Sequence, residues 1–269
     1  MGVRVSSAIL VVVGALALSP ALLAQAAAPE GGARAGPIPR APDGKPDLSG
    51  IWDRAGNADG TPGFGWLKLG EEPPMQPWAA ERYRLARASA TNPTIRGKDE
   101  LDPILYPYCL PHGTPRAYLF MPFEIAQVPG RVYILHESNR QTRRIYTDGR
   151  TVPEGWPPSF MGYSVGRWDG DTLVVETTHL IGLQGSAWID TLGHPHTDAL
   201  RILERIRRVT PDTLEIDFLF DDPKAYTRPW TAKKVFRLKP DWEIMEQIVC
   251  EDRGKEQFFR DVPPPGRGE

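Results

Sequence analysis

Three of the five histidines lie close together in the chain, and they are the side chains best suited to chemistry. His194 and His196 form a His-x-His pair, His179 precedes them at the end of a predicted strand, and Asp190 lies between. An imidazole titrates near neutral pH, so His179 or His196 is suited to act as a general acid or base. The pattern predicts acid–base chemistry in this part of the chain.

Charged residues complete the predicted catalytic set. A carboxylate such as Asp190, or alternatively Glu204, could orient an imidazole, and Arg116 could hold an anion or an enolate. This arrangement requires that residues distant in sequence meet in space. We predict four catalytic residues, which are His179, His196, Asp190 and Arg116.

A metal site is the alternative use of the same histidines. Two or three imidazoles with a carboxylate suit zinc or non-haem iron, and the predicted ligands are His179, His194 and His196. Gly193 and Pro195 indicate a loop, where these imidazoles would instead cap turns or bond to the backbone. No glycine-rich loop leads into a helix, so we expect no cofactor, and a divalent metal remains the alternative.

Residues 162–166 match the pattern G-x-S-x-G, which suggests a serine hydrolase. A nucleophile elbow places its serine on a sharp turn from a strand into a helix. Here Asp169-Gly170-Asp171 predicts a tight hairpin turn, and residues 172–179 form a β-branched run typical of a strand. We therefore predict that Ser164 is a hairpin residue and that the chain is not a hydrolase of this class.

One predicted strand, residues 203–209, carries an unusual number of charges. Because side chains alternate between the faces of a strand, at least one charged residue is expected to point inward. The others are expected in cross-strand ion pairs on the outer face, for instance Arg205 with Glu215 or Asp217. The charged members of this strand are Glu204, Arg205, Arg207 and Arg208.

The elements around these residues are predicted to be a series of hairpins. Asp-Gly, Pro-Gly and Pro-Asp turns recur between short alternating segments, which indicates an antiparallel meander, and closure into a barrel removes its exposed edges. We predict an all-β fold, a lipocalin- or calycin-like barrel with one accessory helix at 77–90. The predicted strands are 118–128, 131–138, 142–147, 162–168, 172–179, 203–209, 213–220, 231–238 and 242–250.

The N-terminal residues predict export. Arg4, an apolar run at 8–23 and Ala24-Gln25-Ala26 match a signal peptide, so the protein is expected in the periplasm or outside the cell. The predicted organisation is a signal peptide at 1–26, a flexible leader at 27–47, one β-rich domain at 48–262 and a tail at 263–269.

The cysteine count predicts a disulfide, and the net charge limits the classes of binding partner. An exported chain with two cysteines predicts one disulfide, Cys109 to Cys250, and two free buried thiols are the alternative. The formal net charge is −2 and no basic block occurs, so nucleic acid is not an expected partner. No later segment is long and apolar enough to span a membrane. The expected partner is a small molecule, and the oligomeric state stays open.

Several segments, taken as a set, resemble a widespread group of exported, uncharacterised bacterial proteins. The resemblance covers nearly the whole mature chain and implies a shared single β-rich domain, without implying a reaction. Gly50-Ile51-Trp52 also resembles the first strand of lipocalin-type barrels, an analogy of fold only. The segments are Pro-Asp-Leu-Ser-Gly-Ile-Trp at 46–52, and residues 109–116, 162–177, 188–196 and 242–251.

Three functions fit these patterns. The first is an exported enzyme, a lyase, isomerase or hydrolase, that applies His, Asp and Arg acid–base chemistry to a partly apolar or aromatic substrate in the barrel cavity. The second is a periplasmic protein that binds a hydrophobic small molecule without catalysis. The third is a metal-dependent enzyme built on the histidine cluster. The chain contains eight tryptophans, and aromatic side chains at a cavity mouth suit apolar ligands in all three cases.

Overall fold

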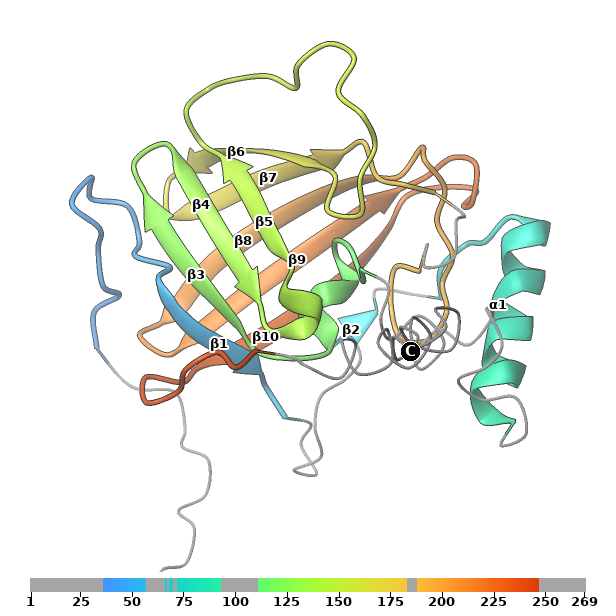
Figure 1. The fold of residues 1–269 in the computed structure, drawn as a ribbon, viewed down its shortest axis with the longest axis horizontal. Helices are drawn as coiled ribbons and strands as arrows, with labels where there is room; N and C mark the ends of the chain where they lie inside the picture. Colours follow the sequence, from blue (N-terminus) through green and yellow to red (C-terminus); the bar gives the residue numbers. More distant parts are fainter. Residues whose placement is uncertain are drawn as a thin grey trace, which may run out of the picture. The chain divides into compact units, whose positions relative to one another are not determined.

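Alternating side chains build a closed β-barrel, as predicted (Figure 1). The computed structural model describes residues 36–56, 66, 68–69, 72–92, 111–182 and 188–246. Its strands are β1 (Gly50–Arg54), β2 (Lys68–Leu69), β3 (Phe123–Val128), β4 (Arg131–His136), β5 (Thr142–Tyr146), β6 (Tyr163–Asp169), β7 (Thr172–Thr178), β8 (Arg201–Thr210), β9 (Thr213–Asp221) and β10 (Trp230–Leu238). Its helices are α1 (Pro77–Thr91) and the short 3₁₀ turns η2 (Arg116–Leu119) and η3 (Ser138–Arg140).

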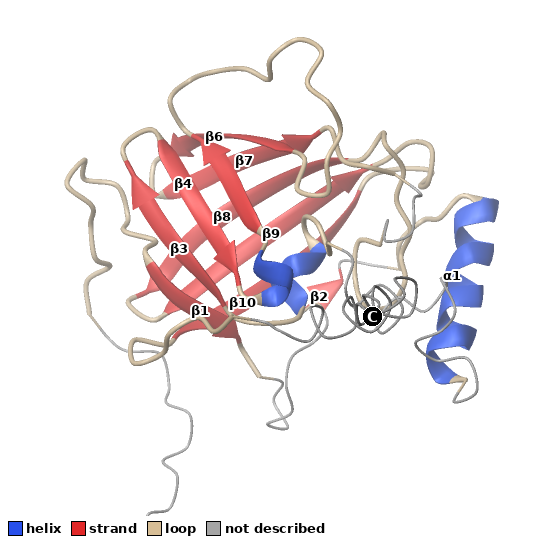
Figure 2. Cartoon of the chain, in the orientation of Figure 1, coloured by secondary structure: helices blue, strands red, loops and turns tan. Residues whose placement is uncertain are grey.

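Nine strands close the barrel. β1 and β3 to β10 are hydrogen-bonded in chain order, and β10 returns to pair with β1, where Trp52 lies opposite Leu238. The short β2 pairs with β10 farther along, at Ala232 and Lys233. Figure 2 shows the strands as one continuous wall, with α1 the longest helix. The predicted barrel with one accessory helix is confirmed.

The β6–β7 hairpin turns where the sequence predicted. Asp169 pairs with Thr172, and Gly170 has φ +57°, a left-handed conformation that a glycine adopts without strain. The G-x-S-x-G segment therefore runs into a strand, and Ser164 lies within β6. The strand–turn–helix geometry of a nucleophile elbow is absent from this segment.

One pairing departs from the predicted antiparallel meander. β5 and β6 are parallel, with Ile145 opposite Ser164. A parallel neighbour requires a crossover connection, and residues 147–162 form a long loop that leaves β5 and returns to β6 (Figure 1). The prediction of a last strand at 242–250 is wrong for its described part, because residues 242–246 form no strand.

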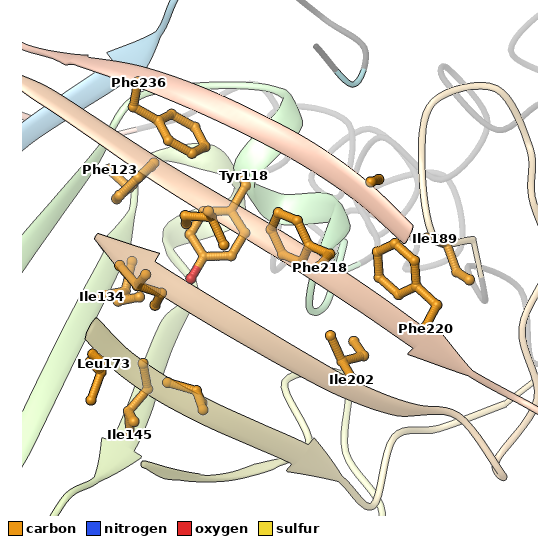
Figure 3. Close-up of a cluster of buried hydrophobic side chains, with 14 of the residues drawn as sticks. Tyr118, Phe123, Ile134, Ile145, Leu173, Ile189, Ile202, Phe218, Phe220 and Phe236 are labelled. Atoms are coloured by element: carbon orange, nitrogen blue, oxygen red, sulfur yellow. The ribbon is translucent and has the colours of Figure 1, made fainter. Parts of the chain in front are cut away.

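The inner face of the barrel holds the hydrophobic core. β9 places Leu214, Ile216, Phe218 and Phe220 on that face at alternating positions, all buried. Figure 3 shows Tyr118 of η2 lying among the aromatic rings of the core. Each such side chain contributes about 1.5–3 kcal/mol through removal of apolar surface from water.

The helix α1 forms as the sequence predicted, with Pro77 at its first turn, where a missing N–H costs nothing. Trp78 Nε1 donates to the carbonyl of Lys224 at 2.9 Å, and the guanidinium of Arg82 lies 4.8 Å from the ring centre of Trp188. The helix therefore contacts the 188–198 loop, which carries the predicted catalytic residues. Among the described residues, no helix combines the length and apolar character needed to cross a bilayer.

The end of the predicted leader contacts the barrel. Arg40 pairs with Asp171 in the β6–β7 turn, and Asp47 accepts a hydrogen bond from Arg208 through its carbonyl at 2.5 Å. The Arg208 guanidinium also lies 5.2 Å from the ring centre of the fully buried Trp52. The predicted disulfide, Cys109 to Cys250, lies outside the described residues.

Candidate functional site

The 188–198 loop is organised around one buried carboxylate. Asp190 Oδ1 accepts the backbone N–H groups of Leu192, Gly193 and His194 at 3.0–3.2 Å. A backbone bond from Ile189 to the carbonyl of His194 closes the turn at 2.8 Å. Aspartate readily forms such local bonds to following amides, so the carboxylate shapes the loop as well as lying in it.

Asp190 and His194 form a buried carboxylate–imidazole pair. His194 Nδ1 lies 2.5 Å from Asp190 Oδ2, and the two side chains are 1% and 0% exposed. Trp66 Nε1 donates a second hydrogen bond to the same oxygen at 3.0 Å. Burial alone would raise the pKa of Asp190, but the interactions with His194 and the donated hydrogen bonds outweigh it and lower that pKa.

This pairing fixes which nitrogen of His194 is the base. An ionised carboxylate only accepts hydrogen bonds, so Nδ1 carries the proton and the Nε2 of a neutral ring carries the lone pair. Nε2 is buried and has no hydrogen-bond partner among the described residues. A positioned imidazole with a free basic nitrogen is the arrangement that general-base catalysis requires.

Aromatic rings surround the pair. The ring of Tyr83 on α1 stacks on His194 with centroids 4.5 Å apart, and Trp230 at the start of β10 lies 5.6 Å from it. Trp230 in turn contacts Phe220 and Tyr226. The imidazole of His194 is therefore packed among aromatic rings.

His196 is held by different partners. Its Nδ1 lies 3.1 Å from the carbonyl of Thr197, while Thr197 donates to Asp222 through its N–H at 2.6 Å and its hydroxyl at 2.8 Å. Burial lowers the pKa of His196, the bond to Thr197 and the charge of Asp222 oppose that shift, and Arg116 adds to it. His196 is thus a buried, neutral imidazole within the electrostatic reach of Arg116.

Arg116 lies on η2, fully buried, with its guanidinium 5.0 Å from the ring centre of Phe120. His112 stacks on the same Phe120 ring at 4.1 Å. Burial, Arg116 and His136 together lower the pKa of His112 well below its usual value. Arg116 also lowers the pKa of His196, so these two predicted catalytic residues interact electrostatically.

His179 has a different hydrogen-bond partner from the histidines of the 188–198 loop. It follows β7 with φ +58°, and its Nδ1 lies 2.9 Å from the hydroxyl of Thr178. Across the described parts of the chain, no three His, Cys, Asp or Glu side chains are grouped so that they could hold a metal ion. The structure therefore does not gather His179, His194 and His196, the three predicted metal ligands.

A second buried polar group was not foreseen as a unit. Arg143 of β5 forms a two-pronged ion pair with Glu204 of β8, and both are buried inside the barrel. Arg143 Nε donates to Ser164 at 3.1 Å, and its NH groups donate to Tyr118 at 2.8 Å and Thr177 at 2.7 Å. All five donors of this guanidinium therefore have acceptors. The prediction that strand 203–209 carries an inward charge is confirmed by Glu204.

The outward charges of β8 pair differently from the sequence prediction. Arg207 pairs with Asp217 at 2.6 Å and with Glu215 at 3.4 Å, whereas Arg205 pairs with Asp169 at 3.3 Å. The predicted pairing of Arg205 with Glu215 or Asp217 is therefore wrong, although Arg205 does lie opposite Asp217 in the sheet. The long arginine side chain reaches the β6 side of β8 instead.

Comparison with known proteins assigns no family. No protein-family model, curated protein or solved structure matches the chain. The functional argument therefore rests on the geometry of the Asp190–His194 pair and its surroundings.

Proposed function

We propose that the protein is an enzyme in which His194, oriented by Asp190, transfers a proton to or from a partly apolar or aromatic small molecule. The observation that carries the proposal is the buried Nε2 of His194, which has no partner among the described residues while Nδ1 is held by a carboxylate. A buried acceptor left unpaired costs about 1–3 kcal/mol, so its retention favours a role with a ligand.

The expected chemistry is general base catalysis followed by return of the proton. Neutral His194 takes a proton at Nε2, and Asp190 stabilises the imidazolium that forms. The rings of Tyr83 and Trp230 favour a substrate with an apolar or aromatic body. This chemistry is common to lyases, isomerases and hydrolases, and it replaces the predicted His179 or His196 by His194 as the reacting imidazole.

Nitrobenzisoxazole tests this proposal directly, because it is an aromatic carbon acid whose ring opens when a base removes one proton. The protein should open the ring faster than buffer, and His194→Gln should lower that rate by about 10²–10⁴-fold, the usual contribution of a general base. Asp190→Asn should also lower the rate, because it removes the carboxylate that fixes the Nδ1–H form.

His179→Gln is the matched control, since it removes the same side chain from a half-buried position outside the pair. Its rate should equal that of the unsubstituted protein. A rate that survives His194→Gln, or a protein that never exceeds buffer, would contradict the proposal. Circular dichroism of each variant separates loss of the base from loss of the fold.

A further inference from the structure

Arg82 on α1 is a cation that forms no ion pair with any of the described residues. Its guanidinium lies 4.8 Å from the ring centre of Trp188, and the face of an indole offers no oxygen atom to its N–H groups. Arg82 Nε is buried and has no hydrogen-bond partner in the same part of the chain. Arg82 therefore retains the planar set of N–H donors with which an arginine binds an anion.

A second arginine on the same helix has the counter-ion that Arg82 lacks. Arg84 forms a two-pronged pair with Glu81 at 2.7 and 2.8 Å on the exposed side of α1. Arg82 lies three residues after the buried Ala79 and four before the buried Ala86, and this spacing places the three side chains on one face of the helix. The helix therefore directs Arg82 toward the body of the protein and leaves Arg84 in solvent.

Arg82 lies beside the proposed base. The next residue, Tyr83, stacks on the imidazole of His194 with centroids 4.5 Å apart. Trp188, which the Arg82 guanidinium contacts, pairs through an antiparallel backbone bridge with Pro195, the residue after His194. Two consecutive residues of α1 thus contact the two sides of one tight turn, and the unpaired cation lies next to the Asp190–His194 pair.

The same turn carries other polar atoms without partners. Trp188 and Trp230 are 1% and 2% exposed, and their Nε1 atoms have no hydrogen-bond partner among the described residues. The ring of Trp230 lies 5.6 Å from that of His194. With Arg82 Nε, these atoms make three unused N–H donors around one unused acceptor, His194 Nε2. An excess of donors of this kind complements a ligand that carries a negatively charged oxygen.

The carboxylate of Asp190 does not serve as the counter-ion of Arg82. Its Oδ1 accepts three backbone N–H groups of its own loop, and its Oδ2 is hydrogen-bonded to His194 Nδ1 and to Trp66 Nε1. Because these bonds engage both oxygens, a second carboxylate can bind at Arg82 without taking donors from Asp190.

We propose that Arg82 selects small organic carboxylates as the substrates of this site, by binding their carboxylate group through two parallel N–H···O bonds. The planar guanidinium matches a carboxylate in this geometry, and the Trp188 indole beneath it offers a further N–H. The inference rests on the proposed function for the reacting atom, which is His194 Nε2. It adds the class of substrate and the residue that distinguishes that class from neutral molecules.

Binding of benzoate and benzamide tests the inference, because the two molecules have nearly the same shape and differ in charge. Isothermal titration of the folded full-length protein should show that benzoate binds at least about tenfold more tightly than benzamide, as expected for hydrogen bonds to a charged group. Arg82→Gln should abolish this preference. Arg84→Gln is the matched control on the same helix and should retain it, because Arg84 is already paired with Glu81.

Arg82→Lys separates recognition from a packing role. It keeps the positive charge over Trp188 but loses the planar donors, so its benzoate affinity should fall by at least about threefold. Should Arg82→Gln fail to fold, this variant decides the question. Equal affinities for benzoate and benzamide, equal losses in Arg82→Gln and Arg84→Gln, or an unchanged benzoate affinity in Arg82→Lys would each overturn the inference.

The two proposals can fail separately. Benzoate binding is measured without a reaction, so selective binding can stand when nitrobenzisoxazole is not opened, and ring opening can stand when benzoate is not preferred. If both hold, benzoate should inhibit the ring opening competitively, because Arg82 and His194 belong to one site. Selective binding of benzoate without inhibition would show that Arg82 serves a different site, and the inference about the substrate would be wrong.

Discussion

Two buried carboxylates, Glu204 of β8 and Asp190 of the 188–198 loop, each pair with a nitrogen-bearing side chain. The two pairs differ in whether every polar atom of that partner has a hydrogen bond. Glu204 pairs with Arg143, whose remaining donors reach Ser164, Tyr118 and Thr177, so every donor of the guanidinium is used. Asp190 pairs with His194, and its oxygens accept further bonds, but the Nε2 of the imidazole has no partner among the described residues.

The difference separates a structural role from a chemical one. A complete network holds strands together, since each polar group replaces the water it lost, and it has no group free to react. An incomplete pair keeps one basic atom available at a cost in stability, as active sites commonly do. We therefore assign Arg143–Glu204 to the architecture of the barrel and Asp190–His194 to its chemistry.

The largest expected effect comes from breaking the complete network. Glu204→Gln leaves the guanidinium of Arg143 buried without its counter-charge, and should lower the free energy of unfolding by about 3–5 kcal/mol. Glu176→Gln is the matched control on the outer face, where Glu176 forms a two-pronged pair with Arg201 at 2.8 and 3.0 Å. That exposed pair should contribute less than about 1 kcal/mol.

Urea denaturation followed by tryptophan fluorescence gives both values. Equal decreases in the free energy of unfolding of the two variants would mean that the buried pair stabilises the protein no more than the exposed pair. The structural role assigned to the Arg143–Glu204 network would then be wrong.

An effect of intermediate size is expected in the pH dependence of the free energy of unfolding, because of His136. This histidine is buried on β4 near Tyr118, and neither ring nitrogen has a partner among the described residues. Burial, with Arg143 adding to it, lowers the pKa of His136 to about 3. The unfolded chain binds a proton near pH 6.5, so between about 6.5 and 3 the unfolded state binds more protons and stability falls as pH falls. The loss from about pH 7 to pH 5 is about 2 kcal/mol per such histidine.

His136→Leu should remove that share, because the variant has no imidazole to protonate at this position. The free energy of unfolding is compared at about pH 7 and pH 5 for the variant and the unsubstituted protein. His112 and His196 add pH dependence of the same sign to both proteins, so the difference reports His136 together with its smaller effect on the pKa of His112. Identical pH dependence in the two proteins would show that His136 is not held neutral by burial.

Most of the barrel follows from local sequence. Alternation and turn residues placed the hairpins, and Gly170 marked the β6–β7 turn, because these signals act between neighbours. The parallel pairing of β5 with β6 was not predictable, since residues 147–162 carry no period and only tertiary packing sets where they return.

The candidate site was predictable only in part. The sequence pointed to Asp190 and to a nearby histidine, but it favoured His179 or His196 over His194. Which histidine pairs with Asp190 depends on the backbone of the loop. Asp190 itself sets that backbone by accepting three amide N–H groups, and residue spacing in the sequence does not predict these bonds. The inward position of Arg143 was predictable from the sequence. Arg143 lies two residues before the apolar Ile145 in the same strand, so both side chains point to the same, buried face. A buried arginine there requires an opposite charge such as Glu204.

The smallest expected effect is the loss of stability in His194→Gln. Comparing it with the loss in Ser164→Ala tests the assignment directly, because one residue belongs to the Asp190–His194 pair and the other to the Arg143–Glu204 network. Ser164→Ala removes the acceptor of Arg143 Nε and a partner of Thr177, and should cost about 1–3 kcal/mol, the penalty for leaving buried polar groups unpaired. His194→Gln removes an Nε2 that satisfies nothing and keeps a side-chain N–H that can replace Nδ1 as a donor to Asp190, which also keeps Trp66 and three amides, so its cost should stay below about 1 kcal/mol. Both values come from the same urea measurement. If His194→Gln costs more than Ser164→Ala, the imidazole is the more structural of the two, and the division between architecture and chemistry is reversed.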